Sequence, residues 1–258
     1  MIEKFKTACW FAQRPSFWPH ALALVGRKLN NADRHERCRP EAAAWAADRA
    51  VTAEEALRRA GLFDPADGPF PSVPQELLAE AQDRARAAKV AMGGPADLDL
   101  LYASVILARP QCMVETGVAY GWSSLVILAA MERNGTGRLV SVDMPYVKRG
   151  NDPWVGIVVP EELRHRWTLI REPDRNGIDR AIAACGGTID LAHYDSDKSY
   201  AGRSYGYPRL WKALRAGGTF ISDDIQDNFG FRDFCAARQL PAQVTESGGK
   251  FVGLARRP

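Results

Sequence analysis

The sequence lacks most of the features that mark specialised classes of protein. Its five cysteines form no CxxC pair, so zinc-ligand spacing is absent and a disulfide framework is not expected in 258 residues. No uninterrupted apolar run reaches about 20 residues, the length that spans a bilayer. There is no internal repeat and no low-complexity segment. We therefore expect free thiols, a reducing compartment, a cytoplasmic location and no transmembrane segment.

An excess of charge of one sign is missing as well. The chain has 34 basic and 31 acidic residues and a formal net charge of +3. A nucleic-acid-binding protein gathers its basic residues into a stripe, and the basic groups here are short and interspersed with acidic residues. We expect no nucleic-acid partner. The hydrophobic fraction of 46% allows a sizeable core.

Residues 1–105 are rich in Ala, Arg and Glu and show helical periodicity without convincing strands. Helices are predicted over 39–50, 52–62, 75–92 and 96–110. Thr52 is a plausible N-cap for the second helix, and Gly61 is its stop. The aromatic segment CWFAQRPSFW (9–18) suggests a cap over an active site, a dimer contact or a membrane-surface attachment. We favour a cap or a homodimer contact, because few basic residues accompany the aromatics.

From residue 111 onward, short apolar runs alternate with helical stretches. Most runs lack polar alternation, as expected of strands buried on both faces of a parallel sheet. The runs are CMVET, RLVSVD, WTLIRE, IDLAHYD, GTFISDD, AQVTES and KFVGLAR, and the last two read as a hairpin across Gly248-Gly249. The fold class predicted is α/β, a doubly wound Rossmann-like sheet ending in an antiparallel hairpin. We expect a helical region, 1–105, followed by a cofactor-binding domain, 106–258.

The loop after the first strand, VETGVAYGWSSL, has the pattern ExGxxxG and lacks the dinucleotide fingerprint GxGxxG. Gly117 and Gly121 would let the backbone approach a ligand, and the following helix start favours a carboxylate. Asp143, at the end of the next strand, is placed to accept hydrogen bonds from ribose hydroxyls. The ligand predicted is a nucleoside with a carboxylate tail, and S-adenosylmethionine fits that description.

These residues resemble the class I S-adenosylmethionine-dependent methyltransferases. Within that class they are similar to the metal-dependent O-methyltransferases of the catechol and caffeoyl-CoA type and to related sugar- or macrolide-modifying enzymes. The resemblance covers about 111–258, with Trp122 where the group usually has Tyr. It implies cofactor contacts from the following residues: Glu115, Gly117, Tyr120, Gly121, Ser123, Asp143 and Asp195.

Two acidic strand ends carry the second half of the resemblance. DSDK (195–198) and GGTFISDD (217–224) are similar to the family segments that hold a divalent metal and a basic side chain. The resemblance implies Asp195, Asp223 and Asp224 as ligands of Mg²⁺ or another divalent cation, with Lys198 as general base. Asp224 stands where the family has Asn, which adds negative charge.

Physical chemistry supports a cation at this place. Carboxylates that converge without one repel each other, and Mg²⁺ prefers oxygen ligands. Lys198 is also open to a salt bridge with Asp195 or Asp197. His193 and His165 stay as alternative bases, because the sugar- and macrolide-modifying relatives often carry His where this chain has Lys198.

The sequence thus predicts an S-adenosylmethionine-dependent O-methyltransferase assisted by a divalent metal. Its acceptor would be a small hydroxylated molecule, namely a sugar, a glycosylated natural product or a phenol. Loop 146–163 is predicted to be a lid or substrate loop, since it is longer than an ordinary connection. The alternatives are a related metal-binding fold with another activity, such as a hydroxylase-like one, and a non-catalytic nucleoside-binding protein.

Overall fold

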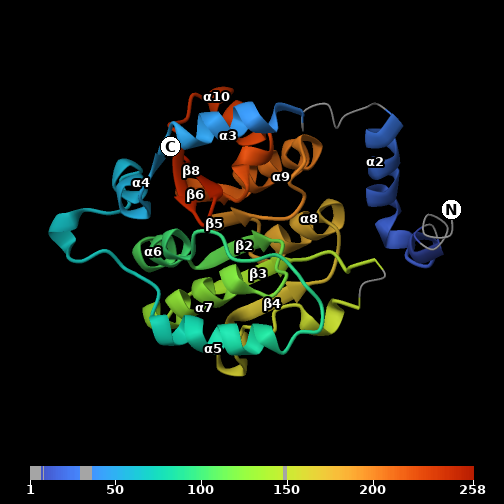
Figure 1. Ribbon diagram of the computed structural model, residues 1–258, viewed down its shortest axis with the longest axis horizontal. Helices are drawn as coiled ribbons and strands as arrows, with labels where there is room; N and C mark the ends of the chain where they lie inside the picture. Colours follow the sequence, from blue (N-terminus) through green and yellow to red (C-terminus); the bar gives the residue numbers. More distant parts are fainter. Residues whose placement is uncertain (1–6, 8, 30–36, 148–149) are drawn as a thin grey trace.

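The described chain folds around a single eight-stranded sheet with the strand order β1-β7-β8-β6-β5-β2-β3-β4 (Figure 1). The computed structural model describes residues 7, 9–29, 37–147 and 150–258. The strands are β1 (Ala50–Val51), β2 (Cys112–Thr116), β3 (Arg138–Val142), β4 (Trp167–Ile170), β5 (Ile189–Tyr194), β6 (Leu214–Ser222), β7 (Gln243–Ser247) and β8 (Lys250–Arg256). Strands β2 to β6 are parallel to one another, and β8 pairs antiparallel with both β6 and β7. The predicted doubly wound sheet with a terminal hairpin is confirmed.

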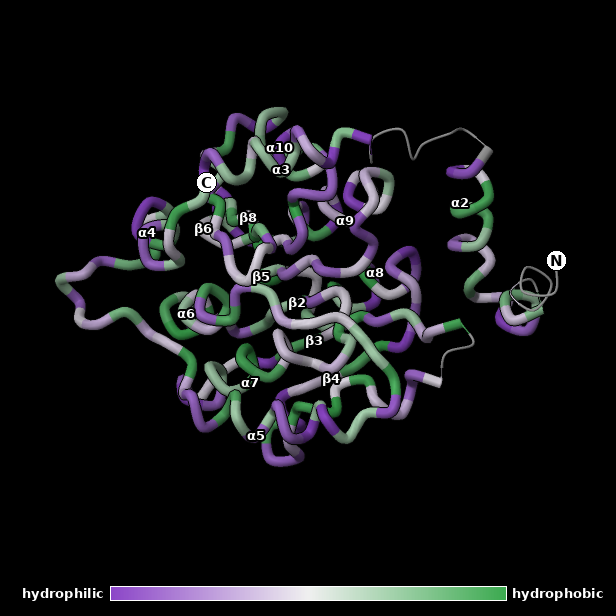
Figure 2. The backbone as a smooth tube through the Cα atoms, viewed as in Figure 1, coloured by the Kyte–Doolittle hydropathy of each residue, from purple (hydrophilic) through white to green (hydrophobic). Residues whose placement is uncertain are grey.

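Helices cover both faces of this sheet. The longer ones are α2 (Trp18–Leu29), α3 (Arg39–Ala47), α4 (Ala53–Arg59), α5 (Gln75–Arg86), α6 (Leu98–Ala108), α7 (Trp122–Asn134), α8 (Asp174–Ala184), α9 (Tyr200–Ala213) and α10 (Gly230–Ala236). Short 3₁₀ turns are η1 (Pro15–Phe17), η3 (Pro65–Asp67), η4 (Asp152–Trp154), η5 (Glu161–Arg166) and η6 (Ile225–Asp227). Helices α4 to α7 pack in one core and α3, α8, α9 and α10 in the other. In Figure 2 the inner helices α6 and α7 are mostly hydrophobic, whereas the outer α5 is more polar.

The N-terminal third joins this architecture more closely than its composition suggests. The absence of strands predicted for 1–105 is wrong, because β1 pairs parallel with β7 at the sheet edge. A strand of two residues is too short to leave a periodic signal. Helix α6 spans residue 105, and Leu57, Phe63 and Val73 lie in the same core as α7. Thr52 caps α4 as predicted, accepting a hydrogen bond from Glu55 N at 3.2 Å.

The helix predicted over 75–92 ends earlier than its periodicity indicates. Helix α5 ends at Arg86. Residues 87–97, here called the strap, then connect it to α6. Tyr120 Oη donates to Val90 O at 2.7 Å and accepts from Met92 N at 3.3 Å. Lys250 Nζ donates to Gly94 O at 3.0 Å. Tertiary hydrogen bonds therefore replace the helical ones, and they hold the strap beside the carboxyl ends of the strands.

Helix α2 lies at the side of the molecule rather than on a face of the sheet (Figure 1). Asn176 on α8 donates to Ser16 O at 2.7 Å, which anchors the chain just before the helix. Arg27 Nη1 donates to Ser199 Oγ at 2.8 Å and contacts Asp197, which anchors the other end. Over the described residues, no helix is long and apolar enough to cross a membrane.

Two cysteines contradict the expectation of free thiols throughout. Cys112, at the start of β2, is disulfide-bonded to Cys185, which follows α8. The two cysteines are 73 residues apart in the sequence, so their spacing does not predict the disulfide. They come together only in the folded chain. Cys9, Cys38 and Cys235 are free.

We expect this disulfide to contribute to stability, because it closes a long loop in the unfolded chain. Replacing both Cys112 and Cys185 by serine should lower the free energy of unfolding by about 2–4 kcal/mol. Chemical denaturation measures the change, and Cys38→Ser is the matched control. Equal stability of the double variant and the parent chain would contradict the expectation.

Candidate functional site

A cavity of about 540 Å³ opens at the carboxyl ends of β2, β3 and β5. The chain proceeds from β2 to β3 on one side and later returns to β5 on the other, so this is the point where the strand order reverses. Ligands of open α/β sheets bind at such points. The volume suits a molecule of nucleoside size. The lining residues are His20, Leu24, Arg27, Gly93, Gly117, Val118, Ala119, Asp143, Met144, Pro145, Tyr146, Val147, Asp174, Asp195, Ser196, Asp197 and Lys198.

The loop from Gly117 to Gly121, here called the glycine loop, forms the floor of the cavity. Gly117 has φ +81°, and a Cβ there would lie 2.3 Å from the carbonyl oxygen of Asp195. Only glycine allows the two strand ends to approach so closely. Ala119 also has a positive φ, +49°, which is uncommon for a residue with a side chain. Backbone held in a strained conformation is typical of ligand-binding loops.

The segment predicted to be a lid packs against this loop. Gly156 N donates to Ala119 O at 2.9 Å, and Val158 N donates to Tyr120 O at 3.1 Å. Val158 is fully buried. Of the described residues of this segment, Tyr146 and Val147 at its start line the cavity. The adjoining residues 148–149 lie outside the described residues. The described part from 150 onward braces the glycine loop, and its role as a lid stays a prediction.

Glu115 lies behind the loop and not on the cavity wall. It is fully buried and accepts hydrogen bonds of 2.6 Å from Ser123, Ser124 and Ser141. Burial raises the pKa of Glu115, but the hydrogen bond from His193 and the serine hydroxyls outweigh it and lower the pKa overall. The carboxylate thus ties the start of α7 to β2 and β3.

Of the seven predicted cofactor contacts, three line the cavity: Gly117, Asp143 and Asp195. The other four do not line the cavity. Tyr120 and Gly121 belong to the loop itself, and Glu115 and Ser123 lie just before and just after it. Tyr120 holds the strap, and Gly121 sits against Gly156, where a Cβ would lie 3.0 Å from its Cα. These four stabilise the loop conformation, and direct contact with a ligand stays a prediction for them.

Asp143 both shapes the loop and faces the cavity. Its Oδ1 accepts a 3.0 Å hydrogen bond from Val118 N, and its Oδ2 pairs with Arg171. Burial raises the pKa of Asp143, while Arg171 opposes that shift. Each carboxylate oxygen can accept a second hydrogen bond, so the ribose contact predicted from the sequence is compatible with this arrangement.

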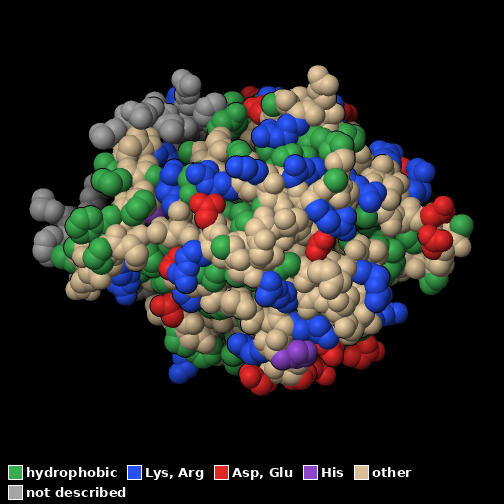
Figure 3. Space-filling model, turned by 180° about the vertical axis from the view of Figure 1, so that it is seen from behind, with side chains coloured by type: hydrophobic (Ala, Val, Ile, Leu, Met, Phe, Trp, Pro, Cys, Tyr) green, Lys and Arg blue, Asp and Glu red, His purple; other side chains and the backbone are tan. Residues whose placement is uncertain are grey.

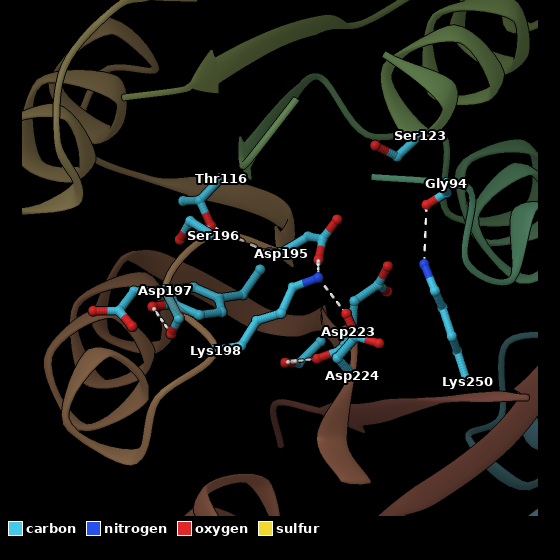
Figure 4. Close-up of polar contacts among 12 residues, drawn as sticks. Gly94, Thr116, Ser123, Asp195, Ser196, Asp197, Lys198, Asp223, Asp224 and Lys250 are labelled. Carbon is cyan, nitrogen blue, oxygen red and sulfur yellow. Dashed lines mark hydrogen bonds and ion pairs between the residues drawn. The ribbon is translucent and has the colours of Figure 1, made fainter. Parts of the chain in front are cut away.

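The two acidic strand ends meet as predicted (Figure 4). Tyr194 of β5 pairs with Ser222 of β6, which places Asp195 beside Asp223. Lys198 Nζ lies 3.1 Å from Asp195 Oδ1 and forms a second ion pair with Asp224. Asp223 turns to His193, whose Nε2 lies 3.2 Å from its Oδ1.

This geometry does not fit the metal site predicted from Asp195, Asp223 and Asp224. The ammonium of Lys198 lies between Asp195 and Asp224, and Asp223 is engaged by His193. Among the residues that the structure describes, no group of three or more His, Cys, Asp or Glu side chains is arranged to hold a metal ion. We derive no step through Mg²⁺.

Lys198 is poorly suited to the predicted role of general base. Burial lowers the pKa of Lys198, but Asp195 and Asp224 outweigh burial and raise the pKa well above its usual value. An ammonium held by two carboxylates keeps its proton. Burial raises the pKa of Asp195 to about 7, with a further contribution from Asp223. Asp195 is therefore the better proton acceptor on this wall.

The two histidines considered as bases are placed elsewhere. His193 is fully buried between Glu115 and Asp223, with Nδ1 3.5 Å from Glu115 Oε1. Burial lowers the pKa of His193, and the two carboxylates outweigh burial to raise the pKa to about 10. His165 lies on η5, half exposed and beside Glu132. Neither lines the cavity.

Four acidic or basic side chains of the cavity wall were not predicted: His20, Arg27, Asp174 and Asp197. Asp197, considered from the sequence as a salt-bridge partner of Lys198, pairs with Arg27 of α2. Asp174 opens α8 and accepts a 2.5 Å hydrogen bond from Ser196 Oγ. Burial raises the pKa of Asp174 to about 6. Asp174 follows β4, the third strand of the βα units, and an acidic residue after such a strand could have been predicted from the sequence to face the ligand.

Comparisons with known proteins agree with this geometry. Residues 114–225 match a family model described as "Methyltransferase domain". The chain is similar in fold to the O-methyltransferase TomG from Streptomyces achromogenes in complex with SAM, at 17% identity and a TM-score of 0.57, over 72% of this chain and 92% of that one.

Two further solved structures show the same fold. An O-methyltransferase from Bacillus cereus in complex with SAH is 17% identical, with a TM-score of 0.53 over 75% of this chain and 95% of that one. A methyltransferase from Geobacter sulfurreducens is 19% identical, with a TM-score of 0.54 over 81% and 97%. No curated protein matches the sequence.

Proposed function

We propose that this chain is a class I S-adenosylmethionine-dependent methyltransferase and that it methylates a hydroxyl oxygen of a small molecule, since residues 114–225 match a methyltransferase family model. The observation that carries the proposal is the single cavity wall shared by Gly117, Asp143, Asp195 and Lys198. The first two suit a nucleoside donor, and the last two suit an acceptor that must lose a proton. The SAM- and SAH-bound structures of similar fold support the choice of donor.

The reaction is a displacement at the methyl carbon. The S–CH₃ bond of the sulfonium breaks, sulfur keeps the electron pair, and an O–CH₃ bond forms. The acceptor proton passes to Asp195, and the ammonium of Lys198 stabilises negative charge on the acceptor oxygen. Positioning of the two reactants side by side supplies most of the remaining rate enhancement.

We assign helix α2 to the donor half of the cavity. His20, Leu24 and Arg27 lie at helical spacing on one face and line the cavity with Asp174 and Asp197. Helix α2 packs near α8, which follows β4. It therefore lies on the side of β2 where β3 and β4 are found. This helix would therefore cover the nucleoside and exclude water from it, which is the role of a cap for part of the region 1–105.

This assignment predicts a selective loss of donor affinity. Arg27→Ala removes the hydrogen bond to Ser199 Oγ that anchors the end of α2, so we expect the Kd for S-adenosylmethionine to rise about 10-fold, the equivalent of one charge-assisted hydrogen bond. Calorimetry measures the change. Lys28→Ala, the adjacent exposed cation, is the matched control and should leave the Kd within about twofold. Equal effects of the two substitutions would contradict the assignment.

Transfer itself is tested with labelled S-adenosylmethionine and a panel of sugars, glycosylated natural products and phenols. Mass spectrometry of the product identifies the methylated atom. Donor binding without transfer to any hydroxyl would favour a nucleoside-binding protein or a related fold with another activity. Methylation of a nitrogen or carbon atom would contradict O-methylation.

Two other expectations remain proposals. Large hydrophobic side chains exposed in the described part of the chain gather on α2 and comprise Trp18, Leu22, Leu24 and Val25. Figure 3 shows hydrophobic side chains at the left edge, where α2 lies in that view. Leu24 lines the cavity, so Trp18, Leu22 and Val25, at helical spacing along α2, are the candidate contact of the homodimer. The cytoplasmic location rests on composition alone.

A further inference from the structure

The carboxylates of the two acidic strand ends are already paired with side chains of the chain itself. Lys198 contacts Asp195 and Asp224 (Figure 4). His193 contacts Asp223. Each of the three predicted metal ligands therefore has a charged or hydrogen-bonded partner already. A divalent ion would have to displace Lys198 from two oxygens at once, against the repulsion between like charges.

A buried arginine fixes the backbone on both sides of the Lys198–Asp224 pair. Arg203 is 1% exposed, and its Nη2 donates to the carbonyl oxygens of Asp223 and Asp224 at 3.1 and 2.7 Å. Its Nε donates to the carbonyl oxygen of Lys198 at 3.1 Å. The same carbonyl accepts a 2.9 Å hydrogen bond from Asn228 Nδ2. One guanidinium thus ties the segment carrying the ammonium to the segment carrying the carboxylates.

The carboxylate of Asp224 is also held in place. Its Oδ1 accepts a 3.0 Å hydrogen bond from Gln226 Nε2, which leaves Oδ2 for Lys198. Gln226 Oε1 in turn accepts from Phe251 N at 3.0 Å, on β8. Asp224 has φ +50°, a left-handed conformation that directs the chain into η6. The ion pair is therefore built into the surrounding backbone and does not depend on one surface rotamer.

We propose that the ammonium of Lys198 serves as the fixed cation of this site in place of a divalent metal, with Asp223 engaged by the His193 ring, so that methyl transfer is metal-independent. This inference rests on the proposed function. Lys198 then contacts the acceptor oxygen and stabilises its negative charge, while the proton goes to Asp195. No oxidant, reductant or further reactant is needed, because the sulfonium supplies both the methyl group and the leaving group.

The first test uses the unaltered chain. Transfer in excess EDTA should stay within about twofold of transfer in added Mg²⁺, because no step of the reaction needs a metal ion. Titration with Mn²⁺, followed by electron paramagnetic resonance, should show only free ion at micromolar concentrations. Loss of transfer in EDTA with recovery on Mg²⁺, or saturable micromolar Mn²⁺ binding, would overturn the proposal.

The second test removes the ammonium. Lys198→Met should lower kcat by about 100-fold or more, the effect of deleting one group that stabilises a developing oxyanion. The Kd for S-adenosylmethionine should stay within about threefold, since Lys198 acts on the acceptor. Lys212→Met, an exposed lysine on α9, is the matched control. An unchanged kcat in Lys198→Met would contradict the proposal.

These outcomes distinguish a failure of the proposal about Lys198 from a failure of the proposed methyltransferase function. If the unaltered chain neither binds S-adenosylmethionine nor methylates a hydroxyl, the proposed function fails. The Mn²⁺ titration still reports on the cation site in that case, because it needs no activity. Circular dichroism and thermal unfolding of Lys198→Met confirm that the variant is folded before its rate is interpreted.

Discussion

Gly117→Ala should weaken S-adenosylmethionine binding by about 100-fold or more, the largest functional effect that we expect from adding one methyl group. The new Cβ would lie 2.3 Å from the carbonyl oxygen of Asp195 and 2.7 Å from its carbonyl carbon. Both atoms belong to backbone, so no side chain can rotate away. Relief requires the glycine loop and the end of β5 to separate, which distorts the cavity floor. Calorimetry with S-adenosylmethionine measures the loss.

Gly135→Ala is the matched control for that substitution. Gly135 ends α7 with φ +68°, close to the φ of Gly117, but a Cβ there would meet nothing within 4 Å. The control carries the conformational cost of a positive φ, about 1 kcal/mol, without the backbone collision. Donor affinity should be unchanged in Gly135→Ala. A similar loss of affinity in both variants would show that strain, and not the close approach, is responsible.

His193→Gln should produce the largest loss of stability, about 3–5 kcal/mol near neutral pH. The substitution leaves two buried carboxylates, Glu115 and Asp223, without the cation between them. Removing one partner of a buried ion pair costs about that much. Chemical denaturation at pH 7 measures the difference. His165→Gln, at a half-exposed position, is the matched control and should stay within about 0.5 kcal/mol of the parent.

The pH dependence of this difference has a definite sign. The pKa of His193 is raised from 6.5 to about 10 by folding, so its stabilisation is complete below about pH 6.5 and is lost as pH rises through about 10. The gap in unfolding free energy between the parent and His193→Gln should therefore narrow above pH 7, by at most about 1.4 kcal/mol per pH unit. A gap that widens from pH 7 to 10 would contradict a protonated His193.

Local patterns in the sequence sufficed for strands β2 to β8 and for the cavity floor. Strands β2, β3, β5 and β6 are largely buried on both faces, so they appear as continuous apolar runs whose ends can be located. Gly117 and Asp143 follow directly from those ends. The meeting of Asp195 with Asp223 also follows, because neighbouring parallel strands end at the same edge of a sheet.

Contacts between distant segments could not be read in this way. Arg27 and Asp197 are 170 residues apart, and the amphipathic pattern of α2 does not say which element its polar face meets. Cys112 and Cys185 are likewise joined only by the fold. The chemical role of Lys198 depends on where its flexible side chain rests. The resemblance of the DSDK motif predicts a position near the acceptor, whereas the pairing of Lys198 with Asp195 and Asp224 decides its charge.

Calorimetric titration of the unaltered chain with S-adenosylmethionine, in excess EDTA, tests the central claim most directly. The cavity at the ends of β2, β3 and β5 predicts saturable binding of one donor molecule per chain, with a Kd of about micromolar magnitude and no metal requirement. Absence of binding heat up to millimolar donor, at more than one temperature, would contradict the account.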